Sequence, residues 1–233
     1  MADSPRHPAR ADADSLVEYV VEGIIQKVRA GQYVPGQRLV ASDLATDFDV
    51  SRAPVREALH VLSGEGVVDL IPNRGAVIRR LTIKELLDFM AFTGSICSLG
   101  VRRATARMDD EAHRRELEQG YAGIKAAWQQ RDADQFINSL YDYHKILNRI
   151  SGNSFLDFFY GRSYFAFFNR LCADIIPGDN WDEYLAHYEQ FHQTVLSGDV
   201  PKAVAEFDAH IAWVMKILQE DANPEVRAAA GGR

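Results

Sequence analysis

The stretch RLVASDLATDFDVSRAPVREALHVLSGEGVVDLIPNRGAVI, residues 38–78, decides how the first third of the chain folds. It predicts a short helix over residues 42–48 and a second helix that begins just after Ser51, a good N-cap residue. Pro54 falls in the first turn of this second helix, where a missing backbone N–H costs little. Two glycines shortly after Leu62 then end the helix.

A hairpin and a further helix flank these two helices. The β-branched runs at 67–71 and 76–80 enclose a Pro-Asn-Arg-Gly turn, which is typical of a hairpin. Upstream, a helix is predicted over residues 15–30 with Ser15 as its cap, because apolar residues recur at helical spacing at Val17, Val21, Ile24 and Val28. Three helices followed by a hairpin are the element order of a winged helix-turn-helix.

Two arginines lie on the outer face of the second helix. Arg52 and Arg56 are one turn apart near its N-terminus, where a recognition helix contacts base edges. Arginine can bind guanine O6 and N7 with two hydrogen bonds. A solvated surface would explain an isolated pair, but the Ser cap, the preceding helix and the following hairpin favour contact with DNA.

Other polar residues extend this predicted contact surface. Arg74 and Gly75 lie at the hairpin tip, from which an arginine could reach phosphate or the minor groove. Arg38 is a candidate for phosphate contact, and Ser51 lies beside the arginine pair. The net charge of −7 does not exclude DNA, because residues 50–80 hold five Arg against three acidic residues.

Residues 81–222 are expected to form an all-α domain. A Thr82–Glu85 capping box opens a long helix, and helical segments are predicted at 110–130, 133–150, 154–175, 181–197 and 200–220. The predicted organisation is therefore mainly α: a flexible N-terminus (1–14), a winged helix-turn-helix (15–80), an all-α effector-binding and dimerisation domain (81–222) and a flexible tail (223–233).

The motif VSRAPVREAL, followed by NRGA, resembles the DNA-binding domain of GntR-type bacterial transcription regulators over residues 15–80. The resemblance implies a dimer that binds a short palindromic operator in double-stranded DNA. By position, Arg52 and Arg56 would read bases and the Arg74-Gly75 tip would enter the minor groove. Ala41 stands where family members usually have Glu, and Ser42 where some have a base-contacting Arg, so the operator sequence is expected to differ.

The segments YDYHKILNRISGN (141–153) and LSGDVPKAVAEFDAH (196–210) resemble the FCD ligand-binding domain of the FadR subgroup. The resemblance implies a small-molecule effector site in which an Asp and three His commonly hold a divalent metal. His144 and His210 match two of these ligands, whereas Leu140 and Tyr188 replace the others. A metal-free pair of buried histidines hydrogen-bonded to Tyr188 is the favoured interpretation, and a metal held with the help of His187 or His192 is the alternative.

The predicted effector is an organic acid or a more apolar metabolite. Thr93 and Cys97 stand where the family frequently has Arg and Glu, which makes the site less charged than usual. The expected effector-binding residues are His144, Tyr188, His210, Thr93 and His192. Arg149, Arg162 and Arg170 are candidate countercharges for an acidic effector. The aromatic stretch FLDFFYGRSYFAFF (155–168) is attributed mainly to core and dimer packing.

These observations predict a cytoplasmic, homodimeric transcription regulator that responds to an effector, and a repressor rather than an activator. No uncharged apolar run of membrane-spanning length and no signal-peptide h-region occur. Cys97 and Cys172 have no metal-type spacing and are expected to be buried, reduced residues. The alternative function is a metal-dependent helical hydrolase using His144 and His210, but the chain has no HExxH motif and no carboxylate in the ligand set.

Overall fold

The computed structural model describes residues 13–72, 74–175 and 180–221. The chain divides into two compact units, Met1–Arg80 and Leu81–Arg233, and each is described by itself. The predicted flexible ends, residues 1–14 and 223–233, lie outside the described residues except for Ala13 and Asp14. These two residues already belong to the first helix, so the prediction that Ser15 caps that helix is wrong.

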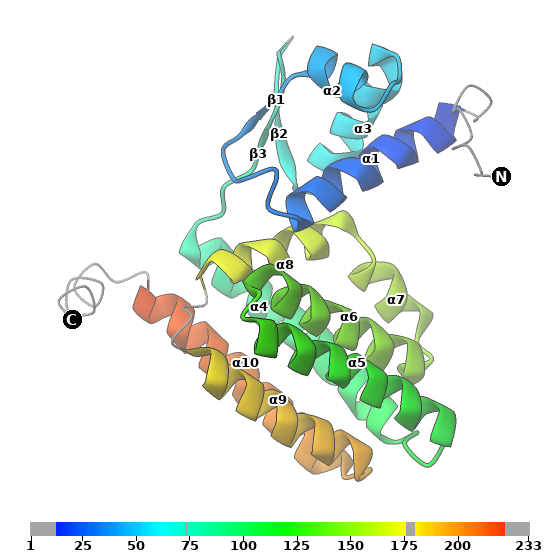
Figure 1. Ribbon diagram of the computed structural model, residues 1–233, viewed down its shortest axis with the longest axis vertical. Coiled ribbons are helices and arrows are strands. Elements are labelled where there is room, and N and C mark those ends of the chain that lie inside the picture. The colour runs from blue at the N-terminus through cyan, green and yellow to red at the C-terminus, as the bar shows by residue number, and fades with distance from the viewer. Residues whose placement is uncertain (1–12, 73, 176–179, 222–233) are drawn as a thin grey trace. The chain divides into compact units, whose positions relative to one another are not determined.

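The N-terminal unit has the predicted three helices and a small antiparallel sheet (Figure 1). Its elements are α1 (Ala13–Arg29), β1 (Arg38–Leu39), α2 (Ala41–Asp47), α3 (Arg52–Gly64), β2 (Val68–Ile71) and β3 (Gly75–Ile78). Helix α1 packs along α3 and buries Val20, Ile24 and Val28, while Val21 is only half-buried. Ile24 and Val28 are thus buried as predicted, whereas Val20 takes the place of Val21 in the buried stripe.

The sheet contains one strand more than the sequence predicted. Strand β3 is central and pairs antiparallel with both neighbours, in the order β1-β3-β2, with Leu70 opposite Ala76 and Arg38 opposite Val77. The predicted hairpin is thus confirmed as β2–β3. Strand β1 was missed because two residues are too short to show an alternating pattern.

Gly75 allows β3 to pass close to β1. It has a φ of +89°, and a Cβ atom at this position would lie 2.1 Å from the backbone oxygen of Leu39. An L-residue would be strained by this conformation and would also push the strands apart. The tip of the wing can therefore keep its shape only with glycine at position 75.

Replacing Gly75 with alanine is expected to lower the local stability of the N-terminal unit by about 1–3 kcal/mol. Native-state hydrogen exchange of the amides in β3 and α3 would measure this loss. Gly64→Ala is the matched control, because a Cβ at Gly64 meets nothing within 4 Å and alanine favours the helix. Equal amide protection in Gly75→Ala and wild type would contradict the prediction.

The described residues of the C-terminal unit form helices joined by short loops and include no strand, as predicted (Figure 1). Its helices are α4 (Ile83–Thr105), α5 (Glu111–Gln130), α6 (Ala133–Ser151), α7 (Ser154–Tyr160), α8 (Ser163–Ile175), α9 (Trp181–Leu196) and α10 (Val200–Asp221). Helix α6 is central and packs against α4, α5, α7 and α8, and α10 packs against α4 and α9. The Thr82–Glu85 capping box is present and starts α4.

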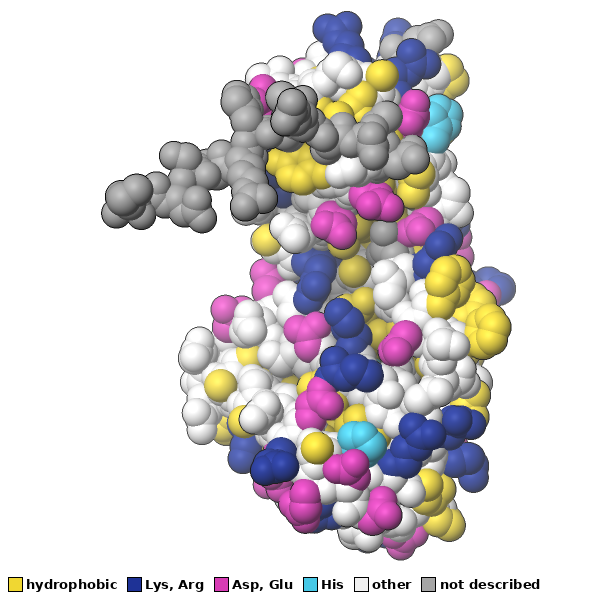
Figure 2. Space-filling view, turned by 90° about the vertical axis from the view of Figure 1, so that its right-hand side faces the viewer, with side chains coloured by type: hydrophobic (Ala, Val, Ile, Leu, Met, Phe, Trp, Pro, Cys, Tyr) yellow, Lys and Arg dark blue, Asp and Glu magenta, His cyan; other side chains and the backbone are white. Residues whose placement is uncertain are grey.

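The single helix predicted over residues 154–175 is two helices in the structure. The segment 154–175 breaks after Tyr160, where Gly161 caps the end of α7 before α8 begins. Glycine has a low helix propensity, so the chain can turn here at little cost. Most of the aromatic stretch lies in the core as predicted, whereas Phe155, Phe158 and Phe159 on the outer face of α7 are exposed, and the predicted dimer packing is not tested for them. Hydrophobic side chains gather at one edge of the helical unit (Figure 2).

Candidate functional sites

The first candidate site is the exposed face at the start of α3. Ser51 occupies the N-cap position, as predicted, but its side chain makes no capping hydrogen bond, and it is exposed. Val55 and Leu59 are buried against the rest of the unit, which leaves Arg52 and Arg56 exposed on the opposite side. The local fold of α3 thus presents two guanidinium groups one turn apart.

A groove of about 610 Å³ brings these arginines together with the wing. It is lined by the start of α2, one face of α3 and the β2–β3 hairpin, and it includes Ala41 and Ser42. The cationic residues among the lining are Arg38, Arg52, Arg56 and Arg74, and Gly75 lies beside them. No acidic residue lines it among the described residues. Figure 2 shows Lys and Arg side chains gathered at this end of the unit.

Arg38 has a role that its sequence context did not reveal. Its guanidinium donates a hydrogen bond to the backbone oxygen of Arg74, at 3.3 Å, while remaining exposed. The side chain therefore ties β1 to the tip of the wing. His60 was also missed, although it continues the spacing of four that links Arg52 and Arg56, and it lines the same groove.

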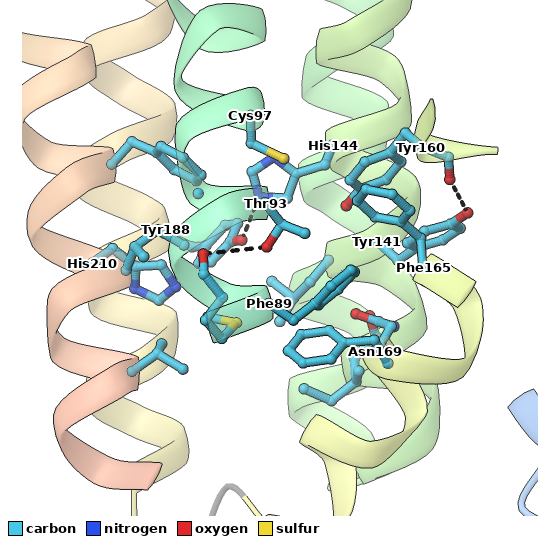
Figure 3. Close-up of a pocket in the computed structure, with 18 of the residues that line it drawn as sticks. Phe89, Thr93, Cys97, Tyr141, His144, Tyr160, Phe165, Asn169, Tyr188 and His210 are labelled. Carbon is cyan, nitrogen blue, oxygen red and sulfur yellow. Dashed lines mark hydrogen bonds between the residues drawn. The ribbon is translucent and has the colours of Figure 1, made fainter. Parts of the chain in front are cut away.

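The second candidate site is a cavity of about 90 Å³ inside the helical unit (Figure 3). Tyr188 and His210 approach it from α9 and α10, and Tyr160 and Phe165 approach it from the opposite side. Thr93 lines it as well, so four of the five predicted effector-binding residues meet here. Leu140 and Cys97 are also lining residues, and the Cys97 side chain is buried as expected. The Cys172 side chain lies outside the part of the structure that is described.

Hydrogen bonds pair the polar residues of this cavity. His144 Nε2 lies 2.7 Å from the Tyr188 hydroxyl, as the metal-free interpretation predicted. For His210 the same interpretation is corrected, because its Nδ1 pairs at 3.4 Å with Nδ1 of His187 on α9 rather than with the Tyr188 hydroxyl. Burial lowers the pKa of His144 to about 4, and burial together with the neighbouring His187 and His144 lowers the pKa of His210 to about 3. Both imidazoles are therefore neutral near pH 7.

The structure does not bring His192 to this cavity, so its assignment to the effector site is corrected. Its Nδ1 lies 2.9 Å from the Tyr143 hydroxyl, and its ring stacks on Tyr121 of α5. A residue four positions after Tyr188 is displaced by about 40° around the helix axis, which is enough here to turn it toward α5.

The predicted countercharges also lie elsewhere. Arg149 forms an ion pair with Glu116 on α5, and Arg170 pairs with Asp134 at 3.4 Å. The Arg162 guanidinium lies over the Phe158 ring. None of these three arginines is among the residues that line the cavity.

The residues around His144 and His210 do not fit a divalent metal. Leu140 supplies no donor atom, and the Tyr188 hydroxyl already occupies His144 Nε2. Within the described ranges, no group of three His, Cys, Asp or Glu side chains is placed to hold a metal ion. A neutral phenol hydroxyl is a poor replacement for the imidazole that a transition-metal site requires, and burial raises the pKa of Tyr188 well above its usual value.

Replacing Tyr188 with phenylalanine is expected to lower the free energy of unfolding by about 1–3 kcal/mol, because a nitrogen of His144 loses its buried partner. Tyr121→Phe is the matched control, since its buried hydroxyl has no hydrogen-bond partner among the described residues. Urea unfolding followed by tryptophan fluorescence reports on the helical unit, which holds all the tryptophans. Equal losses in the two variants would count against the His144–Tyr188 bond.

The fold and the first site together define a winged helix-turn-helix DNA-binding protein with a separate helical domain. Two family models match the chain: "Bacterial regulatory proteins, gntR family" over residues 16–78, and "FCD domain" over residues 89–212. The chain belongs to the GntR family and carries an FCD domain. The first of these models describes bacterial regulatory proteins, which agrees with the predicted class of transcription regulator.

Individual relatives agree with this assignment. The HTH-type transcriptional repressor RspR of Escherichia coli K12 is 27% identical over 117 residues, which are 50% of this chain and 51% of that protein. The chain thus spans about half the length of that curated relative. An uncharacterized HTH-type transcriptional regulator of Streptomyces ambofaciens is 26% identical over 83% of this chain and 81% of its own. The hydrolase alternative finds no support among these relatives.

Solved structures share the fold. E. coli McbR/YncC is similar with a TM-score of 0.78 at 18% identity, over 90% of this chain and 99% of that one. A putative transcriptional regulator GntR from Rhodococcus sp. RHA1 has a TM-score of 0.75 at 18% identity, over 87% and 97%. In the described residues of the present chain, no helix has the length and hydropathy needed to cross a bilayer.

Proposed function

We propose that this regulator is a cytoplasmic repressor that binds a palindromic operator as a homodimer and releases it when a small molecule occupies the helical domain. The observation that carries the DNA-binding part is the groove that Arg52 and Arg56 line together with Arg74, with no acidic side chain among its described lining residues. Arginines so placed match the need for base-edge contacts from a helix and phosphate or minor-groove contacts from a wing.

Each side chain is assigned a role within this groove. Arg52 and Arg56 read base edges in the major groove, with Ser51 beside them at the start of α3. Arg74 enters the minor groove, where Gly75 permits close approach, and Arg38 contacts phosphate while bonded to the wing. A pair of symmetry-related recognition helices then requires a palindrome with half-sites about one helical turn apart.

The effector-binding part rests on the cavity between α4, α6, α9 and α10. A ligand that contacts His144, Tyr188, His210 and Thr93 would touch several helices at once. An organic acid or a more apolar metabolite is the proposed class. The ligand changes DNA affinity only to the extent that it binds the DNA-bound and free forms with different affinity. The assignment as a repressor is supported by the name of the relative RspR.

A selection from random duplexes tests the proposal. The full-length protein should enrich one palindromic sequence, and the affinity for it should fall steeply with salt because phosphate contacts release counterions. Sedimentation analysis should find two chains per duplex. Enrichment of a non-palindromic site by a single chain, or of no sequence at all, would overturn the proposed mode of binding.

A further inference from the structure

The cavity in the helical unit has an uncharged lining throughout. Its nineteen described lining residues include two histidines, four tyrosines, one threonine and one asparagine, and are otherwise apolar or glycine, with no Asp, Glu, Lys or Arg among them. Burial keeps His144 and His210 neutral. A carboxylate in this space would leave water without a compensating cation, which is strongly unfavourable.

Aromatic rings form one wall of the cavity. Phe89 lies with its centroid 5.3 Å from that of Phe165 and 4.1 Å from that of Phe168. Tyr160 packs against Phe165 at 5.0 Å. Rings at these separations offer both faces and edges, and such surfaces bind a planar aromatic molecule better than a branched aliphatic one.

Three polar side chains, Thr93 of α4, His144 of α6 and Tyr188 of α9, lie together beside this aromatic wall (Figure 3). His144 Nε2 and the Tyr188 hydroxyl share one hydrogen bond, and a hydroxyl oxygen has more than one lone pair. The Thr93 hydroxyl, which donates to the backbone oxygen of Met90 at 3.3 Å, also lines the cavity (Figure 3). Both hydroxyl oxygens can accept a further hydrogen bond from a ligand.

We propose that the effector of this chain is an uncharged one-ring aromatic molecule with a hydroxyl group, bound without a metal between the aromatic wall and the Tyr188–His144 pair. This inference rests on the proposed function, because it names the ligand class of the same cavity. Of the two effector classes proposed above, an organic acid and a more apolar metabolite, the cavity favours the more apolar metabolite. It also assigns Tyr188 as a ligand-binding residue in the place of a metal ligand.

Calorimetric titration of the full-length protein with phenol, 4-methylphenol and benzoate tests the ligand class. Phenol and benzoate have the same ring and differ in the charge of the substituent near neutral pH. We expect the phenols to bind at least about 100-fold more tightly than benzoate, because the carboxylate would be buried unpaired. Benzoate binding as tightly as phenol, or no phenol binding at millimolar concentration, would overturn the proposal.

Two variants locate the bound phenol. Tyr188→Phe should weaken phenol binding by about 5- to 10-fold through the lost hydrogen bond, and Thr93→Val provides a second test at the same wall with little change in volume. Tyr121→Phe, which lies outside the cavity, should bind phenol as wild type does. Equal affinity in all three variants would place the phenol elsewhere and overturn the assignment.

Zinc and nickel titrations, with and without benzoate, test the metal-free part. No stoichiometric metal binding is expected, and one metal per chain that also raises benzoate affinity would overturn it. Failure of the proposed DNA-binding function can be distinguished from failure of the proposed ligand class, because DNA selection and sedimentation are performed without ligand. A phenol that binds in the cavity but leaves operator affinity unchanged would support the ligand class and contradict the proposed release from DNA.

Discussion

Replacing Arg52 and Arg56 together with alanine is expected to lower the affinity for the selected operator by about 30-fold to 20,000-fold. Each bidentate contact with a base is worth about 1–3 kcal/mol, and the two side chains lie one turn apart on the same exposed face. The fold should not change, because both arginines are exposed and α3 is held by residues such as Val55, Leu59 and Leu62.

Fluorescence anisotropy at fixed salt would measure this loss, with the operator and a scrambled duplex compared side by side. Loss of base contacts lowers operator affinity more than scrambled-duplex affinity, whereas loss of phosphate contacts lowers both about equally. Arg115→Ala is the control, because Arg115 is an exposed arginine of the helical unit. Unchanged operator affinity in the double variant would disprove the assigned role of both arginines.

In the same experiment, Arg38 allows a residue that positions the wing to be distinguished from residues that contact bases. Its side chain holds the Arg74 backbone and so acts on the wing as well as on phosphate. A role in holding the wing means that removing Arg38 also weakens the contribution of Arg74. The two-residue strand β1, which contains Arg38, therefore contributes to the proposed DNA-contact surface through the wing.

The winged unit could be predicted from the sequence because its signals are local. Ser51, Pro54 and the glycines around position 65 mark the ends of α3, and each acts through its own backbone or its near neighbours. Strand β1 could not be predicted in this way. It exists because β3 offers it backbone partners from nearly forty residues away, and Arg38 and Leu39 alone contain no sign of them.

The residues of the cavity could likewise be predicted only in part from the sequence. Helical spacing correctly placed His144 and His210 on buried faces, and the resemblance placed Tyr188 beside them. The direction of His192 depends on how α9 is rotated against α5, which spacing within one helix does not determine. The arginines at 149, 162 and 170 have partners on other helices or outside the cavity, so proximity in sequence was a poor guide to the charge of the site.

Acidification is expected to destabilise the helical unit through its buried histidines. Burial lowers the pKa of His144 to about 4 and that of His210 to about 3, and burial together with Lys125 lowers that of His192 to about 4. In the unfolded chain a histidine has a pKa of about 6.5. Below that pH the unfolded state binds more protons than the folded state, so the free energy of unfolding decreases as the pH falls from about 6.5 toward 4.

The change in the free energy of unfolding per pH unit identifies the histidines responsible for the loss of stability. Each histidine contributes up to about 1.4 kcal/mol per pH unit, so the three together contribute up to about 4 kcal/mol per unit between pH 6 and 5. Urea unfolding followed by tryptophan fluorescence across this range would measure it. His210→Gln and His192→Gln should each reduce the slope by about a third. Carboxylates add a background to every slope, so the difference between variant and wild type is the decisive quantity. If His210→Gln leaves the slope unchanged, the pKa of His210 in the folded protein is not lowered by burial, and the neutral state inferred for this cavity residue loses its support.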